Sequence, residues 1–380
     1  MFRNPPKLLV AWGRNCAAIC FYISFFLAFA NGSPEQIAYQ LTTRYAPYVN
    51  AEAILDIELI AKCEAESWWS SPAEMRALRG EYSLPLEGLH LAIDPGHIGG
   101  IFAASEGRNF RISEEDFWVR EGELVLEVAE LVEARLTDLG AKVTLLRRSS
   151  CPLNPKKPID YVKQIFAQLN LSDEMTLEMK IEQTLNIRDR AIHLAVVVGE
   201  LAERARVVNE EIRPDALISL HINAAPWPAG DELQLVESNH THVLIFGCLS
   251  ARELSSPRQQ GQLIKKLTNG SGPVEQVLGR SLGDALAKAT QLPASKYEGR
   301  NAILIDPDQP NLWARNLMLL RLVDCPTILL EPYIANSESI YVRVQEALEV
   351  RAQGDSPKEG DLLVEYANAV VSGVLDAYGQ

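Results

Sequence analysis

The stretch LHLAIDPGHIGG, residues 89–100, decides the fold of this 380-residue chain. Its apolar run over residues 89–93 stops at Asp94-Pro95-Gly96, which predicts a buried strand that ends in a sharp turn. His97 then lies in a glycine-containing loop at the carboxyl end of this strand. Open α/β sheets bind their ligands beyond the carboxyl ends of their strands, so His97 is a candidate functional residue.

Two later segments repeat this design. The run ALISL at residues 216–220 leads into His221, and the run TILL at residues 327–330 leads into Glu331, where Pro332 ends the strand. If the three strands are parallel neighbours, their carboxyl ends meet at one edge of the sheet. Two imidazoles and a carboxylate are then expected to converge at that edge.

The helix predicted after the first strand adds a second carboxylate. Its buried stripe repeats at helical spacing and consists of Leu124, Val125, Val128, Val132 and Leu136. Glu121 lies one turn before this stripe on the same face, where the helix macrodipole favours negative charge. His97, Glu121 and His221 together offer ligand types that suit zinc with an open fourth position.

The order of these motifs resembles that of a known family. The motifs are DPGH with its following glycines, Glu121 at the start of the next helix, Leu201-x-x-Arg204 followed by Asn209, SLHINA at residues 219–224, and ILLE ending at Glu331. They are similar to those of the zinc-dependent N-acetylmuramoyl-L-alanine amidases, which cut peptide stems from peptidoglycan. The resemblance covers roughly residues 89–380.

The resemblance implies an enzyme that hydrolyses the amide bond between N-acetylmuramic acid and L-alanine in peptidoglycan. It implies Zn²⁺ as the cofactor, with His97, Glu121 and His221 as the metal ligands and Glu331 as the catalytic carboxylate. Glu331 would take a proton from the attacking water and pass it to the leaving nitrogen. Two alternatives stay open: a zinc hydrolase of a soluble peptide or N-acyl amino acid, and a catalytically inactive peptidoglycan-binding protein. Whether an activator protein is needed also stays open.

The chain departs from the family pattern at two loops. The family usually has a glycine directly after the first histidine, where this chain has Ile98, and the acidic glycine-rich loop that follows is replaced by IFAASEGRNF. After the catalytic glutamate the family tends to have a small residue and then glycine, where this chain has Pro332 and Tyr333. The metal residues themselves are kept, so the departures concern the loops around the substrate and not the metal ligands.

The fold prediction is a single three-layer α/β domain over residues 89–380, with a mostly parallel or mixed central sheet flanked by helices. A short helical extension is expected over residues 31–88, which repeat apolar side chains at helical spacing. A large insertion at about residues 150–200 is too long for a simple connection. A lid over the zinc crevice and a surface decoration are equally weighted interpretations of this insertion.

Residues 1–30 are typical of a signal peptide. Arg3, Lys7 and Arg14 form a basic segment, residues 16–30 are apolar, and Ala28-Phe29-Ala30 is a cleavage motif. An uncleaved membrane anchor is the alternative, but the apolar run is short against the roughly 20 residues of a membrane span. We therefore expect export to the periplasm or the cell wall, with no stable membrane span after cleavage.

The composition is that of an ordinary globular protein, with 47% hydrophobic and 23% charged residues. The net charge is −14, and the basic residues of the predicted signal peptide would leave with it. This charge argues against nucleic acid or an anionic membrane as the main partner, whereas peptidoglycan is the partner that the resemblance implies. Cys248 and Cys325 flank apolar runs and are interpreted as small buried hydrophobes.

Other polar and aromatic side chains receive structural interpretations. His240 and His242 precede the apolar run at residues 243–246 and lie on one face of the predicted strand, where a solvent-exposed strand end is preferred over metal binding. Trp68-Trp69 is interpreted as a pair packed on the domain, with stacking on sugars as the alternative. Arg204 is interpreted as a solvated or structural charge and is not assigned catalysis.

Overall fold

The computed structural model describes residues 32–168, 175–230 and 233–379. Its centre is a seven-stranded sheet in the order β4-β1-β5-β9-β6-β8-β7. The strands are β1 (His90–Pro95), β4 (Lys142–Leu145), β5 (Ala216–Leu220), β6 (His242–Phe246), β7 (Ile303–Leu304), β8 (Leu312–Arg315) and β9 (Thr327–Glu331). β4, β1, β5 and β9 run parallel, β6 is antiparallel to β9, and β7 is antiparallel to β8. The prediction of a mixed, mostly parallel sheet is confirmed.

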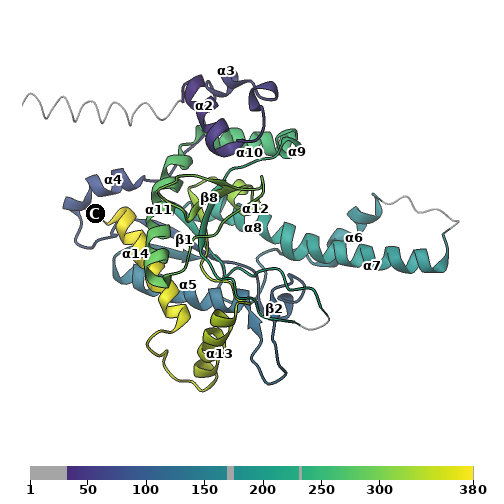
Figure 1. Ribbon diagram of the computed structural model, residues 1–380. Coiled ribbons are helices and arrows are strands. Elements are labelled where there is room, and N and C mark those ends of the chain that lie inside the picture. Colours follow the sequence, from purple (N-terminus) through teal and green to yellow (C-terminus); the bar gives the residue numbers. More distant parts are fainter. Residues whose placement is uncertain (1–31, 169–174, 231–232, 380) are drawn as a thin grey trace, which may run out of the picture.

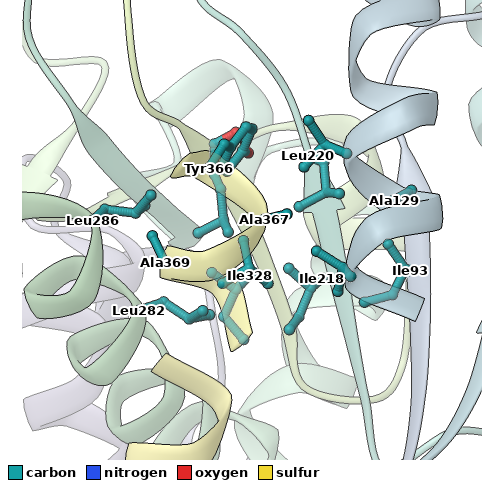
Figure 2. Packing of buried hydrophobic residues seen from close by; sticks show 14 of the residues in the cluster. Ile93, Ala129, Ile218, Leu220, Leu282, Leu286, Ile328, Tyr366, Ala367 and Ala369 are labelled. Carbon is teal, nitrogen blue, oxygen red and sulfur yellow. The ribbon is translucent and has the colours of Figure 1, made fainter. Parts of the chain in front are cut away.

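Three long helices cover one face of this sheet: α5 (Glu121–Asp138), α11 (Ser271–Thr290) and α14 (Leu362–Tyr378). Figure 2 shows how alternate residues of the strands, such as Ile218 and Ile328, meet Leu282 of α11 and Ala369 of α14. The predicted buried stripe of α5 is fully buried in this core. Each such aliphatic side chain contributes roughly 1.5–3 kcal/mol on burial, so this face anchors the strand ends that carry the site.

The opposite face of the sheet carries shorter helices, which completes the three layers. α8 (Glu200–Arg206), η6 (Val207–Ile212) and α12 (Met318–Leu322) pack on Ala92 and Leu217. α10 (Pro257–Thr268) packs beside them, on Leu244 and Phe246. The remaining elements are α9 (Ala251–Leu254), α13 (Glu338–Ala352), η4 (Gly100–Phe102) and the two-stranded ribbon of β2 (Asn109–Phe110) and β3 (Val119–Arg120).

The N-terminal segment is helical, as predicted, and packs directly on the body. Its elements are α2 (Pro34–Gln40), η1 (Leu41–Tyr45), η2 (Ala51–Ala53), α3 (Ile57–Ile60), α4 (Pro72–Ala77) and η3 (Arg79–Glu81). Ile37, Leu41 and Tyr45 are buried in the same cluster as Phe246 of β6. The predicted signal peptide, residues 1–30, lies outside the described residues. Within the described part of the chain, no helix combines the length and apolar character needed to cross a bilayer.

A cluster of buried charges fastens this segment to α11. Arg44 donates hydrogen bonds to the carbonyl oxygens of Phe246 (2.8 Å) and Gly272 (3.1 Å) and pairs with Glu275. Lys266 of α10 donates a second bond to Glu275, at 2.9 Å. We call Arg44, Lys266 and Glu275 the staple cluster. Elsewhere in the segment, Trp68 donates to the carbonyl oxygen of Pro214 at 3.0 Å, so its packing interpretation is confirmed.

The insertion forms an arm of two helices, α6 (Pro158–Phe166) and α7 (Leu177–His193), followed by η5 (Leu194–Gly199). Figure 1 shows the arm extending away from the body. Its helices pack on one another through Ile165, Ile187 and Ala191. Its base packs on Ile98, the residue directly after His97. The insertion therefore touches the His97 loop at one end, while its role as a lid stays a prediction.

Residues 300–310 contain a short strand. This strand is β7, whose residues pair with β8 at the edge of the sheet. A two-residue strand has no periodicity of its own, and its pairing depends on long-range contacts. Cys63, Cys151, Cys248 and Cys325 are free thiols, and the burial predicted for Cys248 and Cys325 is confirmed.

Candidate metal centre

Three adjacent parallel strands deliver the candidate residues to one edge of the sheet. β5 lies between β1 and β9, and the main-chain N–H of His221 donates to the carbonyl oxygen of Leu330 at 2.9 Å. His221 therefore lies beside Glu331, the last residue of β9. His97 follows the turn at the end of β1, and α5 begins at Glu121. The four residues singled out by the sequence gather at this edge.

His97, Glu121 and His221 each offer a ligand atom, and these atoms all lie within 4.8 Å of one another. Nε2 of His97 is 3.4 Å from Oε2 of Glu121, and Nδ1 of His221 is 3.0 Å from Oε1 of Glu121. The two imidazole rings are nearly perpendicular, at 84°, with their centroids 5.1 Å apart. Two imidazole nitrogens and a carboxylate oxygen this close together are a donor set that fits a zinc ion.

Glu121 is ionised in this environment. Burial raises the pKa of its carboxyl group, but the imidazoles of His97 and His221 and the guanidinium of Arg108 outweigh burial and bring the pKa to about 2. Conversely, burial lowers the pKa of His221, and the hydrogen bond and charge of Glu121 raise it above its usual value. Since metal ligands bind in their deprotonated forms, a proton and a cation would compete for His221.

Glu106 holds His97 from its outer side. Its Oε1 lies 3.2 Å from Nδ1 of His97, and its Oε2 accepts a hydrogen bond from the main-chain N–H of Ile98 at 2.9 Å. A carboxylate on the outer nitrogen fixes the ring and leaves Nε2 for a ligand. The sequence analysis missed this residue, which is the acid of the altered IFAASEGRNF loop. The position of Glu106 in the sequence does not indicate a contact with His97, because this contact depends on how the loop folds back.

The backbone of the His97 loop is fixed by two buried arginines. Arg204 donates to Asp94 (2.8 Å) and to the carbonyl oxygens of Pro95 (2.9 Å) and His97 (2.7 Å). Arg147 donates to the carbonyl oxygens of Pro95 (3.1 Å) and Gly96 (3.0 Å). These bonds hold His97 at a φ of 53°, a left-handed conformation that costs a non-glycine residue about 1–3 kcal/mol.

The counter-charges complete what we call the loop cluster, which consists of Asp94, Arg147, Glu200 and Arg204. Glu200 accepts from Arg204 at 2.9 Å, and Asp94 also accepts from the hydroxyl of Ser219 at 2.6 Å. Burial raises the pKa of Asp94, but Arg204 and Ser219 outweigh burial and lower it. The solvated interpretation of Arg204 is wrong, because this side chain is 1% exposed, and the structural interpretation is confirmed.

Gly96 is required by the position of His221. A Cβ atom on Gly96 would lie 2.4 Å from Cε1 of the His221 ring, far inside contact distance. The two ligand-bearing strands therefore approach so closely that the glycine of the DPGH motif has a packing role.

Glu331 has a partner that the sequence analysis did not foresee. The antiparallel register of β6 and β9 pairs it with His242, whose Nε2 is 2.6 Å from Oε2 of Glu331. Burial raises the pKa of Glu331, but the hydrogen bond and charge of His242 outweigh burial and lower it. His242 is 1% exposed, so its interpretation as a solvent-exposed strand end is wrong. Neither His240 nor His242 belongs to the metal-binding group found among the described residues.

Two residues after Glu331, the backbone takes a left-handed conformation. Tyr333 has a φ of 84°, in the left-handed region that favours glycine. Its hydroxyl donates to Glu365 at 2.8 Å, and its main-chain N–H donates to the carbonyl oxygen of His240 at 3.3 Å. Tyr333 therefore takes this conformation at the cost of backbone strain, and its buried ring is anchored in the core.

The family model described as N-acetylmuramoyl-L-alanine amidase matches residues 91–342, a range that contains His97, Glu121, His221 and Glu331. No curated protein matches.

Similar solved structures include the N-acetylmuramyl-L-alanine amidase Ami1 from Mycobacterium smegmatis, with 20% identity, 77% of this chain and 98% of that chain covered, and a TM-score of 0.40. They also include the catalytic domain of CwlV, an N-acetylmuramoyl-L-alanine amidase from Bacillus (Paenibacillus) polymyxa var. colistinus, with 15% identity, coverage of 75% and 96%, and a TM-score of 0.39. A third is the N-acetylmuramoyl-L-alanine amidase AmiC2 of Nostoc punctiforme, with 14% identity, coverage of 76% and 97%, and a TM-score of 0.39.

Proposed function

Because the chain belongs to the N-acetylmuramoyl-L-alanine amidase family, we propose that it cleaves the bond between N-acetylmuramic acid and L-alanine in peptidoglycan, with zinc as its metal. The observation that carries this proposal is the convergence of His97, Glu121 and His221 within 4.8 Å, beside Glu331. Peptidoglycan lies outside the cytoplasm, so the proposal includes export, with residues 1–30 as the signal peptide.

The chain's own residues have distinct parts in this proposal. His97, Glu121 and His221 would hold the metal, and Glu106 would fix the His97 ring so that Nε2 serves as the ligand. Zinc, when bound, supplies a Lewis acid that polarises a carbonyl group and makes water more acidic. The donor set of two imidazoles and one carboxylate, with no thiolate, is one that zinc hydrolases use.

Glu331 is the proposed proton-transfer group. Its lowered pKa keeps it ionised at neutral pH, so it can take a proton from the water that attacks the amide carbonyl. The same carboxyl group can then give that proton to the leaving nitrogen, which makes the amine a neutral leaving group. Glu331 ends β9 next to His221, so it is placed at the same edge of the sheet as the metal ligands.

The test is product analysis. The purified protein with one zinc per chain is incubated with purified peptidoglycan, and the soluble products are identified by mass spectrometry and amino-terminal analysis. We expect free stem peptides that begin with L-alanine. The matched control is Glu331→Gln, which should retain zinc and release no peptides.

Other outcomes separate the alternatives. Intact peptidoglycan, from protein that holds zinc and cleaves soluble peptides or N-acyl amino acids, would replace the proposed substrate with a soluble one. Binding to peptidoglycan without any hydrolysis would indicate the inactive binding protein. Full activity of Glu331→Gln would remove Glu331 from the mechanism.

A further inference from the structure

His242 lies on the strand next to Glu331 and faces its carboxylate. It is the first residue of β6, and the antiparallel register sets it opposite Glu331. Its Nε2 is 2.6 Å from Oε2 of Glu331, and its side chain is 1% exposed, against 18% for Glu331. The imidazole is therefore the inner member of the pair, and the carboxylate is the member that water and substrate can reach.

Two aromatic neighbours fix the orientation of this imidazole. The ring of His240 stacks on it at 5.9 Å between centroids and 26° between planes, and the ring of Tyr297 meets it at 5.7 Å and 61°. Contacts of this kind restrict rotation of a buried ring. Nδ1 of His242 has no hydrogen-bond partner among the described residues. The one short hydrogen bond of the ring is therefore the bond to Glu331, while the hydroxyl of Tyr297 is 3.4 Å from the same nitrogen.

The direction of the hydrogen bond between His242 and Glu331 follows from the ionised state of the carboxylate. An ionised carboxylate has no hydrogen to donate, so Nε2 of His242 carries the hydrogen and donates it. Hydrogen bonds to a charged acceptor are roughly twice as strong as neutral ones. We propose that His242 is a positioning residue, whose Nε2–H binds Oε2 of Glu331 and leaves Oε1 to exchange the proton. This inference rests on the proposed role of Glu331.

The hydrogen bond from His242 to Glu331 would also affect the second proton transfer, from Glu331 to the leaving nitrogen. A donor on Oε2 stabilises the ionised carboxylate more than the protonated acid. A proton that Glu331 has taken from water is therefore passed on readily to the leaving nitrogen. His221 acts on Glu331 in the same sense, and Glu121 acts in the opposite sense. His242 differs from both because it makes a direct bond to Glu331 and is outside the metal-binding group.

The test compares two substitutions of His242. His242→Leu has a similar size and no donor, whereas His242→Gln keeps an N–H that can reach Glu331. The zinc-loaded variants are assayed for kcat and KM on purified peptidoglycan, and zinc affinity is measured by competition with a chelator. We expect His242→Leu to lose about 10–100-fold in kcat, with KM and zinc affinity within about twofold of wild type. His242→Gln should recover most of the loss.

The matched control is His90→Leu. His90 also lies at the start of a strand, and its ring bonds the side chain of Thr144 through Nε2, at 3.0 Å from Oγ1. It lies at the opposite end of β1 from the site, so this variant should keep the wild-type kcat. A second readout needs no activity: NMR of protein labelled with ¹⁵N-histidine should show a protonated Nε2 on His242, whose signal shifts or is lost in Glu331→Ala.

Failure of this inference is distinguishable from failure of the proposed function. Wild-type kcat in His242→Leu, or an equal loss in His242→Leu and His242→Gln, would overturn the positioning role while peptidoglycan cleavage stands. An unprotonated Nε2 on His242, or a signal that Glu331→Ala leaves unchanged, would overturn it as well. Zinc-loaded wild-type protein that leaves peptidoglycan intact would contradict the proposed function, while the NMR measurement would still decide the contact.

Discussion

The loop cluster lies beneath the turn that carries His97, and the staple cluster lies between the N-terminal segment and α11. Both combine buried cationic side chains with carboxylates, and in both a guanidinium also donates to main-chain carbonyl oxygens. Arg204 binds the carbonyls of Pro95 and His97, and Arg44 binds those of Phe246 and Gly272. The loop cluster balances two arginines with two carboxylates, whereas the staple cluster sets two cations around one carboxylate.

The difference lies in what each cluster holds. An arginine offers five N–H donors in a rigid fork, so one buried side chain can satisfy several carbonyl groups of irregular backbone. In the loop cluster that backbone includes His97, a candidate metal ligand, in a left-handed conformation, and in the staple cluster it joins the N-terminal segment to the body. Buried charged side chains therefore hold segments of backbone in place in this fold. Whether they affect the site depends on which segment they hold.

The largest effect is expected from Arg204→Met. This change leaves Asp94 and Glu200 buried without their main cation, which costs about 3–5 kcal/mol of unfolding free energy. It also removes a donor from the carbonyl of His97, so we expect zinc affinity to fall by about 10–100-fold and peptidoglycan hydrolysis to fall with it. Urea unfolding and chelator competition measure the two effects. Unchanged zinc affinity in the folded variant would separate the loop cluster from the site.

Arg44→Met should have a comparable cost in stability and none at the site. Glu275 keeps Lys266, so we expect a loss near the lower end of about 3–5 kcal/mol. Zinc affinity and kcat per folded molecule should equal those of wild type, since the substituted side chain contacts none of the site residues. If zinc affinity fell as in Arg204→Met, the distinction between the two clusters would be wrong.

Acid should reduce the contribution of the staple cluster. Burial raises the pKa of Glu275, but Lys266 and Arg44 outweigh burial and lower it below its value of about 4.3 in the unfolded chain. A carboxylate with a lowered pKa stabilises the fold above the unfolded value, and this stabilisation is lost as the pH falls through the folded value. Glu275→Gln should therefore be less stable than wild type at pH 7, and the gap should shrink towards pH 3. Urea midpoints at several pH values test this, and a constant gap would contradict it.

The smallest effect is expected from Arg206→Ala. Arg206 pairs with Glu203, Glu210 and Glu211, a set of the same kind as the two clusters but in contact with solvent. Water and salt screen exposed pairs, so the urea midpoint should not change measurably. A loss as large as that of Arg44→Met would show that burial is not what gives the clusters their weight.

Most of the fold, and the residues that converge at the sheet edge, could be predicted from local sequence patterns. β1, β5 and β9 are continuous apolar runs that end in a polar residue, and the stripe of α5 has a clear helical period, so each could be predicted from neighbouring residues alone. Because β1, β5 and β9 are parallel neighbours, His97, His221 and Glu331 reach the same edge. The two-residue strand β7 could not be predicted, since its existence depends on its partner.

The missed contacts have one physical origin. His242 meets Glu331 because β6 runs antiparallel to β9 in a register that no local feature specifies. Glu106 meets His97 through a loop that folds back, and Arg204 is buried because helix α8 packs over the turn after β1. Each contact joins segments far apart in the chain or in an irregular conformation. A residue type and its spacing are insufficient to predict such partners.

Ile98 and the arm depend on each other. Its side chain is fully buried against Ala195 and Val196 at the base of the arm, in the position where the resemblance expects a glycine. A protein that lost the arm would expose this isoleucine beside His97, and one that gained the arm over a glycine would leave its base unfilled. The two changes are therefore expected to be inherited as a pair, so the residue after the DPGH motif should report, in related sequences, whether an arm is present.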